Sequence, residues 1–346
     1  MHVALLIAFL LLGAGTQSSS QNAPAAAQSL TPQQVLEQAR EAAAHSHLDQ
    51  AMTLLNTLPA GPNELVGVER LRGLILYQKE QLPDAEVAFE LAVLQDPNDH
   101  ESLEMQGVTL YRLGRPADAI PILEKAHTTV SNANIDPQYV LGLCYTDTKR
   151  YDDARRAFAA QFGFGSDSAE AYLIAARLFL RREFADEAQR FAAKAVEINP
   201  SLPLAHELLG EVALAKADLS LAVKELEAER KLNPLNGLMY DRLGDAYVRN
   251  GQFEEARQAL NKAILLEPNA TGPYILLGEA LVKLGDPIQA LHYLKRAASM
   301  DPGNSVVHNI MGQAYRSLGQ MAEANREYKM AVEIQHKNDP KPAQAR

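Results

Sequence analysis

Small and apolar residues recur along this chain with a period of 34 residues. Alanine stands at nine positions from Ala51 to Ala324, each 34 residues after the last except for one step of 35. Twelve residues before each of these alanines lies a glycine or another alanine. A fixed period of this length is typical of chains that stack copies of one small structural unit. We therefore divide the chain into nine repeats and number the positions within each from 1; they begin at residues 32, 66, 100, 135, 169, 203, 237, 271 and 305.

Each repeat has the hydrophobic pattern of two helices. In the seventh repeat, Tyr240, Leu243 and Tyr247 lie on one face of a helix, at positions i, i+3 and i+7. Gly251 follows in a polar turn, where glycine provides the left-handed conformation that ends a helix. A second apolar stripe then ends before Pro268. No alternating pattern of a strand competes, so the predicted fold is all-α.

The small residue at position 8 predicts that the two helices of a repeat touch closely. Glycine inside a helix costs about 1 kcal/mol relative to alanine, yet seven of the nine repeats carry it at this position. We expect it to face the alanine at position 20 of the second helix. A single helical pair cannot bury its apolar face alone, so the repeats are expected to stack into a solenoid.

The pattern closely resembles the tetratricopeptide repeat family over about residues 32–338. The family unit has Gly or Ala at position 8, Ala at position 20 and a large apolar or aromatic residue at position 24. In this chain position 24 is filled by Leu55, Phe89, Leu123, Phe158, Ala192, Leu226, Leu260, Leu294 and Tyr328, of which only Ala192 departs from the pattern. The resemblance implies a right-handed α-α superhelical solenoid of about nine repeats. It also implies a non-enzymatic scaffold that binds a protein or peptide, and it leaves that ligand unnamed.

The resemblance further assigns the ligand-binding concave wall to positions 2, 5, 9, 12 and 13 of the first helices. On this chain the candidate groove residues are Arg70, Leu74, Tyr77, Tyr111, Arg112, Tyr139, Leu143, Leu173, Arg177, Arg181, Glu207, Glu211, Asp241, Asp245 and Glu279. The residues from repeats two to five are aromatic and partly basic, and those from repeats six to eight are acidic. Its arginines would bind ligand carboxylates, and its acids would meet basic ligand residues. The alternative interpretation is that these charges form an ordinary solvated face.

Composition and charge narrow the possible chemistry. The chain has 33 Lys and Arg against 43 Asp and Glu, a formal charge of −10, which opposes binding to nucleic acid. The single cysteine, Cys144, excludes an intrachain disulfide framework and a multi-cysteine metal site, and it is interpreted as a small buried hydrophobe. No motif of a catalytic, metal or cofactor site occurs, and no stretch outside the repeats is long enough for a catalytic domain. We therefore expect no enzyme activity, no cofactor and no bound metal.

The two ends of the chain differ in composition from the repeats. Val3–Leu12 is an unbroken apolar run, too short for the about 20 residues that span a bilayer. It fits a secretory signal peptide over residues 1–17, with the cleavage site left open, followed by a flexible leader over 18–31. The sequence thus predicts an exported protein, periplasmic or extracellular, without an integral membrane span. The alternative is an uncleaved N-terminal segment that tethers the chain to a membrane. Residues 339–346 are predicted to be a disordered tail.

The repeats are irregular over residues 128–168. One extra residue separates the third and fourth repeats, and the fourth repeat lacks a closing proline. Either this region is a hinge in the superhelix or it holds a tolerated loop insertion.

The biological role has more than one interpretation. Besides a peptide-binding scaffold in the cell envelope, the chain fits a structural component of an envelope or exopolysaccharide-secretion assembly. It also fits an accessory subunit that presents substrates to a separate enzyme. The last predicted helix has no further helix to cover it, which makes a homo-oligomer through that helix another hypothesis.

Overall fold

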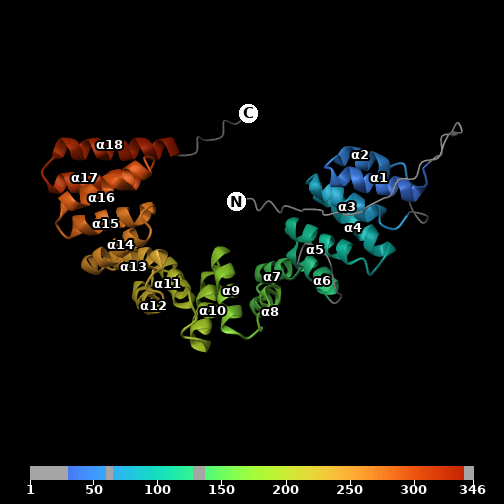
Figure 1. Cartoon of the computed structure of the whole chain (residues 1–346), viewed down its shortest axis with the longest axis horizontal. Helices are drawn as coiled ribbons and strands as arrows, with labels where there is room; N and C mark the ends of the chain where they lie inside the picture. Colours follow the sequence, from blue (N-terminus) through green and yellow to red (C-terminus); the bar gives the residue numbers. More distant parts are fainter. Residues whose placement is uncertain (1–29, 60–64, 128–136, 339–346) are drawn as a thin grey trace, which may run out of the picture. The chain divides into compact units, whose positions relative to one another are not determined.

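Helices account for the regular structure of this chain. The computed structural model describes residues 30–59, 65–127 and 137–338, which form eighteen helices and no strand (Figure 1). The chain divides into two compact parts, Met1–Ser166 and Asp167–Arg346, here called the N-terminal part and the C-terminal part. In each part the helices are paired in hairpins that follow the 34-residue spacing. The predicted all-α repeat solenoid is confirmed.

The N-terminal part contains four helical hairpins. Each hairpin packs against the next through its neighbouring helices. The helices are α1 (Pro32–Ala44), α2 (Leu48–Leu55), α3 (Val68–Gln78), α4 (Leu82–Gln95), α5 (His100–Arg112), α6 (Pro116–His127), α7 (Pro137–Asp147) and α8 (Tyr151–Phe162).

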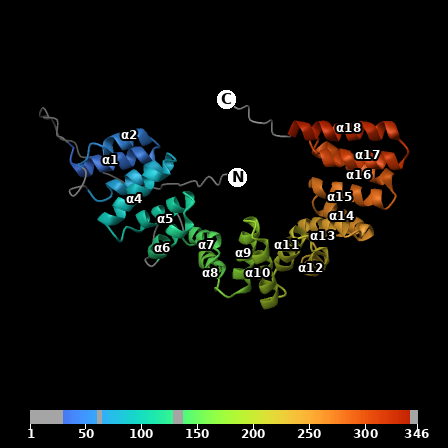
Figure 2. The ribbon, with the colours of Figure 1, turned by 180° about the vertical axis from the view of Figure 1, so that it is seen from behind.

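The C-terminal part contains five hairpins, and Figure 2 shows those from α15 to α18 as successive layers. The first helices of consecutive hairpins also pack against each other, as α13 does on α15 and α15 on α17. The helices are α9 (Ala169–Arg181), α10 (Ala185–Ile198), α11 (Ala205–Ala215), α12 (Leu219–Leu232), α13 (Gly237–Arg249), α14 (Phe253–Leu266), α15 (Thr271–Lys283), α16 (Pro287–Met300), α17 (Ser305–Ser317) and α18 (Met321–Asn338).

Predictions about the ends of the chain lie largely outside the described residues. The signal peptide at 1–17, most of the leader at 18–31 and the tail at 339–346 are not described. Thr31, at the end of the predicted leader, is the N-cap of α1, and its side chain accepts a hydrogen bond from the Gln34 amide at 3.3 Å. The hinge at 128–168 stays a prediction, since residues 128–136 are not described either.

The glycine at position 8 faces the large side chain at position 24, a correction to the expected contact with the alanine at position 20. A Cβ added at Gly107 would lie 2.5 Å from the Leu123 side chain, and one added at Gly210 would lie 2.6 Å from that of Leu226. Atoms this close overlap, so only glycine fits in these two hairpins unless the opposing side chain shifts. All nine alanines at position 20 are nevertheless buried, with 0% exposure. They belong to the same close helix contact: in the sixth repeat the Ala222 carbonyl oxygen lies 3.4 Å from the Cβ position of Gly210.

The fifth repeat has alanine at both position 8 and position 24. It has Ala176 at position 8, and position 24 is Ala192, the one departure from the family pattern; both are fully buried. The rings of Phe179 and Phe191 fill the core beside them, 5.0 Å apart and edge to face. In the fifth repeat an alanine at position 8 thus goes with a small residue at position 24, whereas in the first repeat Ala39 goes with Leu55.

Position 15, in the turn between the two helices, has a left-handed backbone in every repeat. Its φ lies between 58° and 80° at all nine sites, including the predicted Gly251 at 75°. Glycine occupies four of these sites, and five carry a side chain, among them Ala217 at 58°. Because a left-handed residue with a Cβ costs roughly 1–2 kcal/mol, these five turns are strained relative to the glycine turns.

A tyrosine at position 11 connects two successive hairpins at equivalent places in the two parts. The hydroxyl of Tyr145 donates to Glu124 at 2.5 Å, and that of Tyr247 donates to Glu227 at 2.6 Å. In both cases the glutamate belongs to the second helix of the preceding repeat. Burial, followed by the hydrogen bond to Glu227, raises the pKa of Tyr247, so the hydroxyl stays protonated and remains a donor.

Candidate peptide-binding surface

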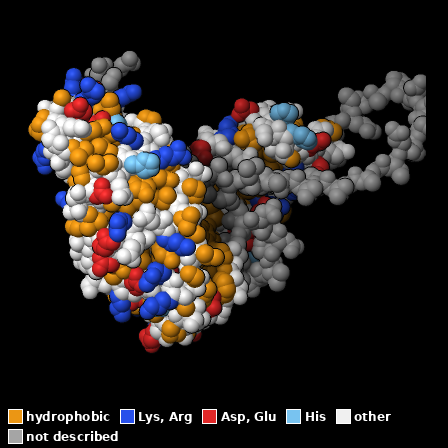
Figure 3. Space-filling model, turned by 60° about the vertical axis from the view of Figure 1, so that its left-hand side comes forward, with side chains coloured by type: hydrophobic (Ala, Val, Ile, Leu, Met, Phe, Trp, Pro, Cys, Tyr) orange, Lys and Arg blue, Asp and Glu red, His pale blue; other side chains and the backbone are white. Residues whose placement is uncertain are grey.

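The candidate groove residues lie on the first helices of their hairpins, as the register requires. Those from Arg70 to Leu143 belong to α3, α5 and α7 of the N-terminal part, and those from Leu173 to Glu279 belong to α9, α11, α13 and α15 of the C-terminal part. Figure 3 shows that acidic, basic and hydrophobic side chains are interspersed on the face of the molecule it presents. Charge of one sign thus does not dominate this face.

The two arginines of the N-terminal set are already engaged by carboxylates of this chain. Arg70 pairs with Asp99 at 3.1 Å and with Glu101 at 3.5 Å. Arg112 pairs with Glu80 and lies over the ring of Tyr77, 4.8 Å from its centroid. A ligand carboxylate at either arginine would have to compete with these contacts.

The other members of the N-terminal set are apolar or aromatic. All five are half-buried, so each has one side in the core and the other at the surface; they are Leu74, Tyr77, Tyr111, Tyr139 and Leu143. The ring of Tyr139 packs against Phe158, with centroids 5.9 Å apart. This part of the surface offers aromatic contact area more than free charge.

Two basic residues of the C-terminal set are exposed. Arg177 and Arg181 lie one turn apart on α9, next to the half-buried Leu173. Neither arginine forms an ion pair within 4 Å with any residue that the structure describes. They are therefore open to a carboxylate from a ligand.

Glu207 is buried and its carboxylate is occupied. It is 4% exposed, its Oε1 pairs with Arg242, and its Oε2 accepts a hydrogen bond from Asn236 at 2.5 Å. Burial raises the pKa of Glu207, and the charge of Arg242 opposes that rise. Glu207 thus positions Arg242 and Asn236, the N-cap of α13, and little of Glu207 is presented to a ligand.

Arg242 is a central residue of this surface that the sequence analysis did not select. It lies at position 6, which is apolar in repeats 2 to 6 and in repeats 8 and 9. The one arginine at a position that is otherwise mostly apolar was the sequence feature that could have identified it. Its second nitrogen reaches Glu211 at 2.9 Å, so one guanidinium bridges two carboxylates of α11.

Position 9 carries an acid in three consecutive repeats, on helices that pack side by side. The first, Glu211, is paired with Arg242, and the second, Asp245, lies 3.5 Å from Arg249. The third, Glu279, is half-buried and forms no hydrogen bond or ion pair with a described residue. We call Glu211, Asp245 and Glu279, on α11, α13 and α15, the acidic row. The first two carboxylates are paired with arginines of this chain, and the third is free.

Asp241 lies beside this row in an unfavourable environment. Its Oδ1 is buried without a hydrogen-bond partner among the described residues. Its Oδ2 faces Gly272, 3.4 Å from where a Cβ on that glycine would be. Burial, followed by the charge of Asp245, raises the pKa of Asp241 to about 6.

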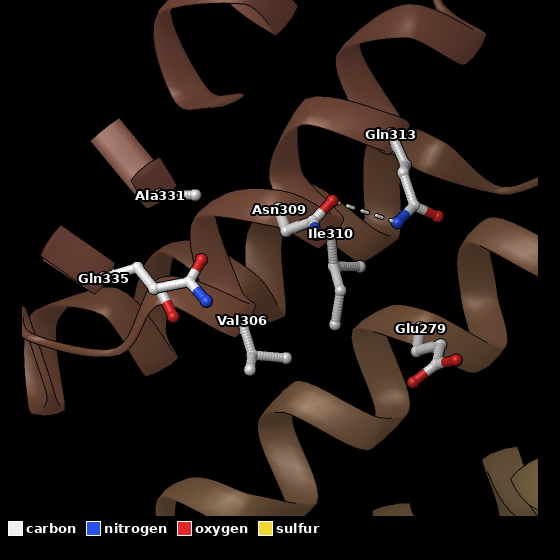
Figure 4. Close-up of a pocket in the computed structure, with 8 residues that line it drawn as sticks. Glu279, Val306, Asn309, Ile310, Gln313, Ala331 and Gln335 are labelled. Carbon is white, nitrogen blue, oxygen red and sulfur yellow. Dashed lines mark hydrogen bonds between the residues drawn. The ribbon is translucent and has the colours of Figure 1, made fainter. Parts of the chain in front are cut away.

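The row ends at a hollow of about 400 Å³ between α15, α17 and α18 (Figure 4). Its walls combine one carboxylate, several amide or hydroxyl groups and a few apolar side chains. The lining residues are Glu279, Ser305, Val306, Asn309, Ile310, Gln313, Ala331 and Gln335. Val306, Asn309 and Gln313 continue positions 2, 5 and 9 into the ninth repeat, beyond the predicted set.

Within the described ranges, no group of three or more His, Cys, Asp and Glu side chains is arranged to hold a metal ion. Across the same ranges, no helix has the length and apolarity needed to cross a membrane. Cys144 is fully buried, in agreement with its interpretation as a small hydrophobe.

Comparison with protein families gives three matches along the chain. Residues 78–161 match the family described as anaphase-promoting complex, cyclosome, subunit 3. Residues 244–285 match a family described as TPR repeat, and residues 281–346 match one described as tetratricopeptide repeat. Together with the hairpin geometry above, these matches show that the chain carries tetratricopeptide repeats.

Several solved structures are similar to parts of the chain. A structure titled as YrrB, a TPR protein with an unusual peptide-binding site, is 24% identical, with a TM-score of 0.48 over 53% of this chain and 95% of its own. A structure of MamA is 23% identical, with a TM-score of 0.44 over 47% of this chain and 95% of its own. MamA from Desulfovibrio magneticus RS-1, from residue 41 to its end, is 21% identical, with a TM-score of 0.47 over 50% of this chain and 98% of its own.

Proposed function

We propose that the chain is a non-enzymatic scaffold that binds an extended segment of another protein along the first helices of its C-terminal part. The acidic row carries this proposal, because it places carboxylates on three adjacent helices and the last of them is free. A segment lying across these helices meets acids at Asp245 and Glu279 and the exposed arginines on α9. Such a segment would carry basic residues at one end and an acidic residue at the other.

The N-terminal part has a different share in this proposal. Its arginines are paired with acids of the same chain, so it contributes mainly aromatic contacts from Tyr77, Tyr111 and Tyr139. Aromatic side chains provide large contact areas at low entropic cost. They therefore suit ligands that are recognised by their shape more than by their charge.

Selection from a random library tests the proposed function. Phage displaying random dodecapeptides are selected on the purified full chain, and enriched peptides are measured by fluorescence anisotropy. We expect basic peptides whose binding is lost when Asp245 and Glu279 are both changed to Lys. The control changes Glu254 and Glu323, exposed acids on second helices, to Lys and is expected to preserve binding. No enrichment, or loss of binding in the control alone, would contradict the proposal.

Location in the cell envelope is a second part of the proposal, and it depends on the sequence of the first residues. The apolar run Val3–Leu12 supports export through a secretory signal, with an uncleaved tether as the alternative. Expression of the full chain followed by fractionation and intact-mass measurement tests it. A processed protein in the exported fraction is expected, and a full-length protein in the cytosolic fraction would contradict export.

Self-association through α18 also stays a prediction. Tyr328 is half-buried and packs within the last hairpin, because a Cβ added at Gly312 would lie 2.5 Å from its ring. Met330, in contrast, is exposed and one turn before the half-buried Ile334. Sedimentation of the chain with Met330 and Ile334 both changed to Glu tests the hypothesis. A dimer in the parent that becomes a monomer supports it, and a parent that is already monomeric ends it.

A further inference from the structure

The hollow at the end of the acidic row has a distinct chemical character. Figure 4 shows Glu279 on one side and Gln335 on the other, with Val306 and Ile310 between them. Val306 is 54% exposed, whereas Ile310 is buried, at 4% exposure. We call these two apolar side chains the floor of the hollow and its polar lining residues the rim.

Glu279 is the one charged group among the residues that line the hollow. The equivalent acids in the two preceding repeats, Glu211 and Asp245, each have an arginine of this chain as partner. Lys283 follows Glu279 by one turn on α15, and the structure has no ion pair between them. The carboxylate thus retains its full capacity to accept hydrogen bonds from a cation.

The amide groups of the hollow add acceptors of the same kind. Asn309 uses its Oδ1 for a long contact of 3.4 Å with the Gln313 side-chain nitrogen, which leaves the Gln313 oxygen open. At the start of α17 the Val306 amide, which would otherwise attract an anion, is already bonded to the Asn304 side chain at 3.1 Å. The hollow therefore suits a cation better than an anion.

We propose that this hollow binds the side chain of an arginine in an extended segment of a partner protein. The guanidinium forms two parallel hydrogen bonds with Glu279 and further bonds with the amide oxygens at the rim. Its aliphatic stem packs on Val306 over the apolar floor. A lysine has the same charge but no planar fork, so it fills fewer of these acceptors. The inference rests on the proposed function and names the residue that anchors its ligand.

The test uses the peptides selected on the full chain. Each arginine of an enriched dodecapeptide is replaced in turn by lysine or by citrulline, which keeps the shape and loses the charge. We expect one arginine whose replacement by citrulline weakens binding about tenfold, in line with the loss of a charge-assisted pair, and whose replacement by lysine weakens it less.

Variants of the chain locate that arginine in the hollow. Glu279→Gln is expected to weaken the parent peptide about tenfold and to leave the citrulline peptide unchanged. Glu323→Gln removes the same charge from an exposed site on α18 outside the hollow and is expected to leave both affinities unchanged. Glu279→Arg is expected to shift the selection from arginine to an acid at the anchor position.

The outcomes separate this inference from the proposed function. Basic peptides that bind the acidic row with equal affinity in the parent and in Glu279→Gln overturn the arginine anchor and leave the scaffold proposal standing. A weakening of the citrulline and arginine peptides by the same factor also overturns it, because the effect would then not depend on the guanidinium. Failure of the full chain to enrich any peptide overturns both.

Discussion

Asp241 is expected to destabilise the folded chain at neutral pH, so replacing it should stabilise the chain. Its buried Oδ1 has no hydrogen-bond partner in the described structure, and burial together with Asp245 raises its pKa to about 6. Asparagine has nearly the same shape and no charge. A substitution by Asn therefore removes the desolvation of the carboxylate and its repulsion from Asp245 without leaving a cavity.

The size of the effect follows from the pKa of Asp241. A rise from the ordinary 3.8 to about 6 corresponds to about 3 kcal/mol of lost stability once the group is ionised. Asp241 retains partial contact with solvent, so we expect a gain of about 1–2 kcal/mol for Asp241→Asn at pH 7.5. The folded state holds its proton more tightly than the unfolded state. The destabilisation is therefore absent below about pH 4, increases as the pH rises through 6, and is complete above it.

Urea unfolding of the parent and the variant at pH 4, 6 and 7.5 measures this difference. Hydrogen exchange of the α13 and α15 amides adds a local readout, because a chain of stacked repeats need not unfold in one step. Asp186→Asn, at an exposed surface pair with Lys216, is the control and should change stability by less than about 1 kcal/mol. An Asp241→Asn variant that is less stable at pH 7.5, or equally improved at pH 4 and 7.5, would refute the reasoning.

Three further predictions concern the packing of the repeats. Tyr247→Phe should cost about 1–2 kcal/mol through loss of its hydrogen bond to the preceding hairpin. Tyr315→Phe, also at position 11 but in register with a lysine of the preceding repeat, should cost almost no stability. Equal losses of stability for the two variants in urea unfolding would contradict a role for the Tyr247 hydrogen bond. Gly210→Ala should destabilise the chain by about 1–3 kcal/mol. In a double-mutant cycle, Gly210→Ala combined with Leu226→Ala should cost less stability than the sum of the two single substitutions. Additive costs would show that the two residues are independent. Ala217→Gly should stabilise by about 1 kcal/mol by relieving its left-handed backbone, and a lower unfolding midpoint would argue against strain there.

The repeat itself could be predicted from the sequence because its period and apolar stripes follow directly from helix geometry. Position 8 and its meaning, a close helix contact, were also evident from the cost of glycine in a helix. The opposing residue was not, because both position 20 and position 24 lie near the contact. At Gly210 an added Cβ would meet the Leu226 side chain first, at 2.6 Å, and the Ala222 carbonyl oxygen at 3.4 Å.

The candidate surface was less accessible to sequence reasoning for two physical reasons. A register identifies which charges share a face, but it does not tell which are neutralised across neighbouring helices, as Glu207 is by Arg242. The predicted surface also ended at Glu279, since Val306, Asn309 and Gln313, at positions 2, 5 and 9 of the ninth repeat, carry no charge. The hollow they form with α18 depends on side chains from three helices, a property that no single stripe encodes.

The most direct test of the account is a crystal structure of the full chain with a selected basic peptide. The account predicts an extended peptide across α11, α13, α15 and α17, with one guanidinium within hydrogen-bond distance of Glu279. A peptide bound to the second helices, or one that crosses the acidic row with Glu279 in contact with water alone, would contradict it.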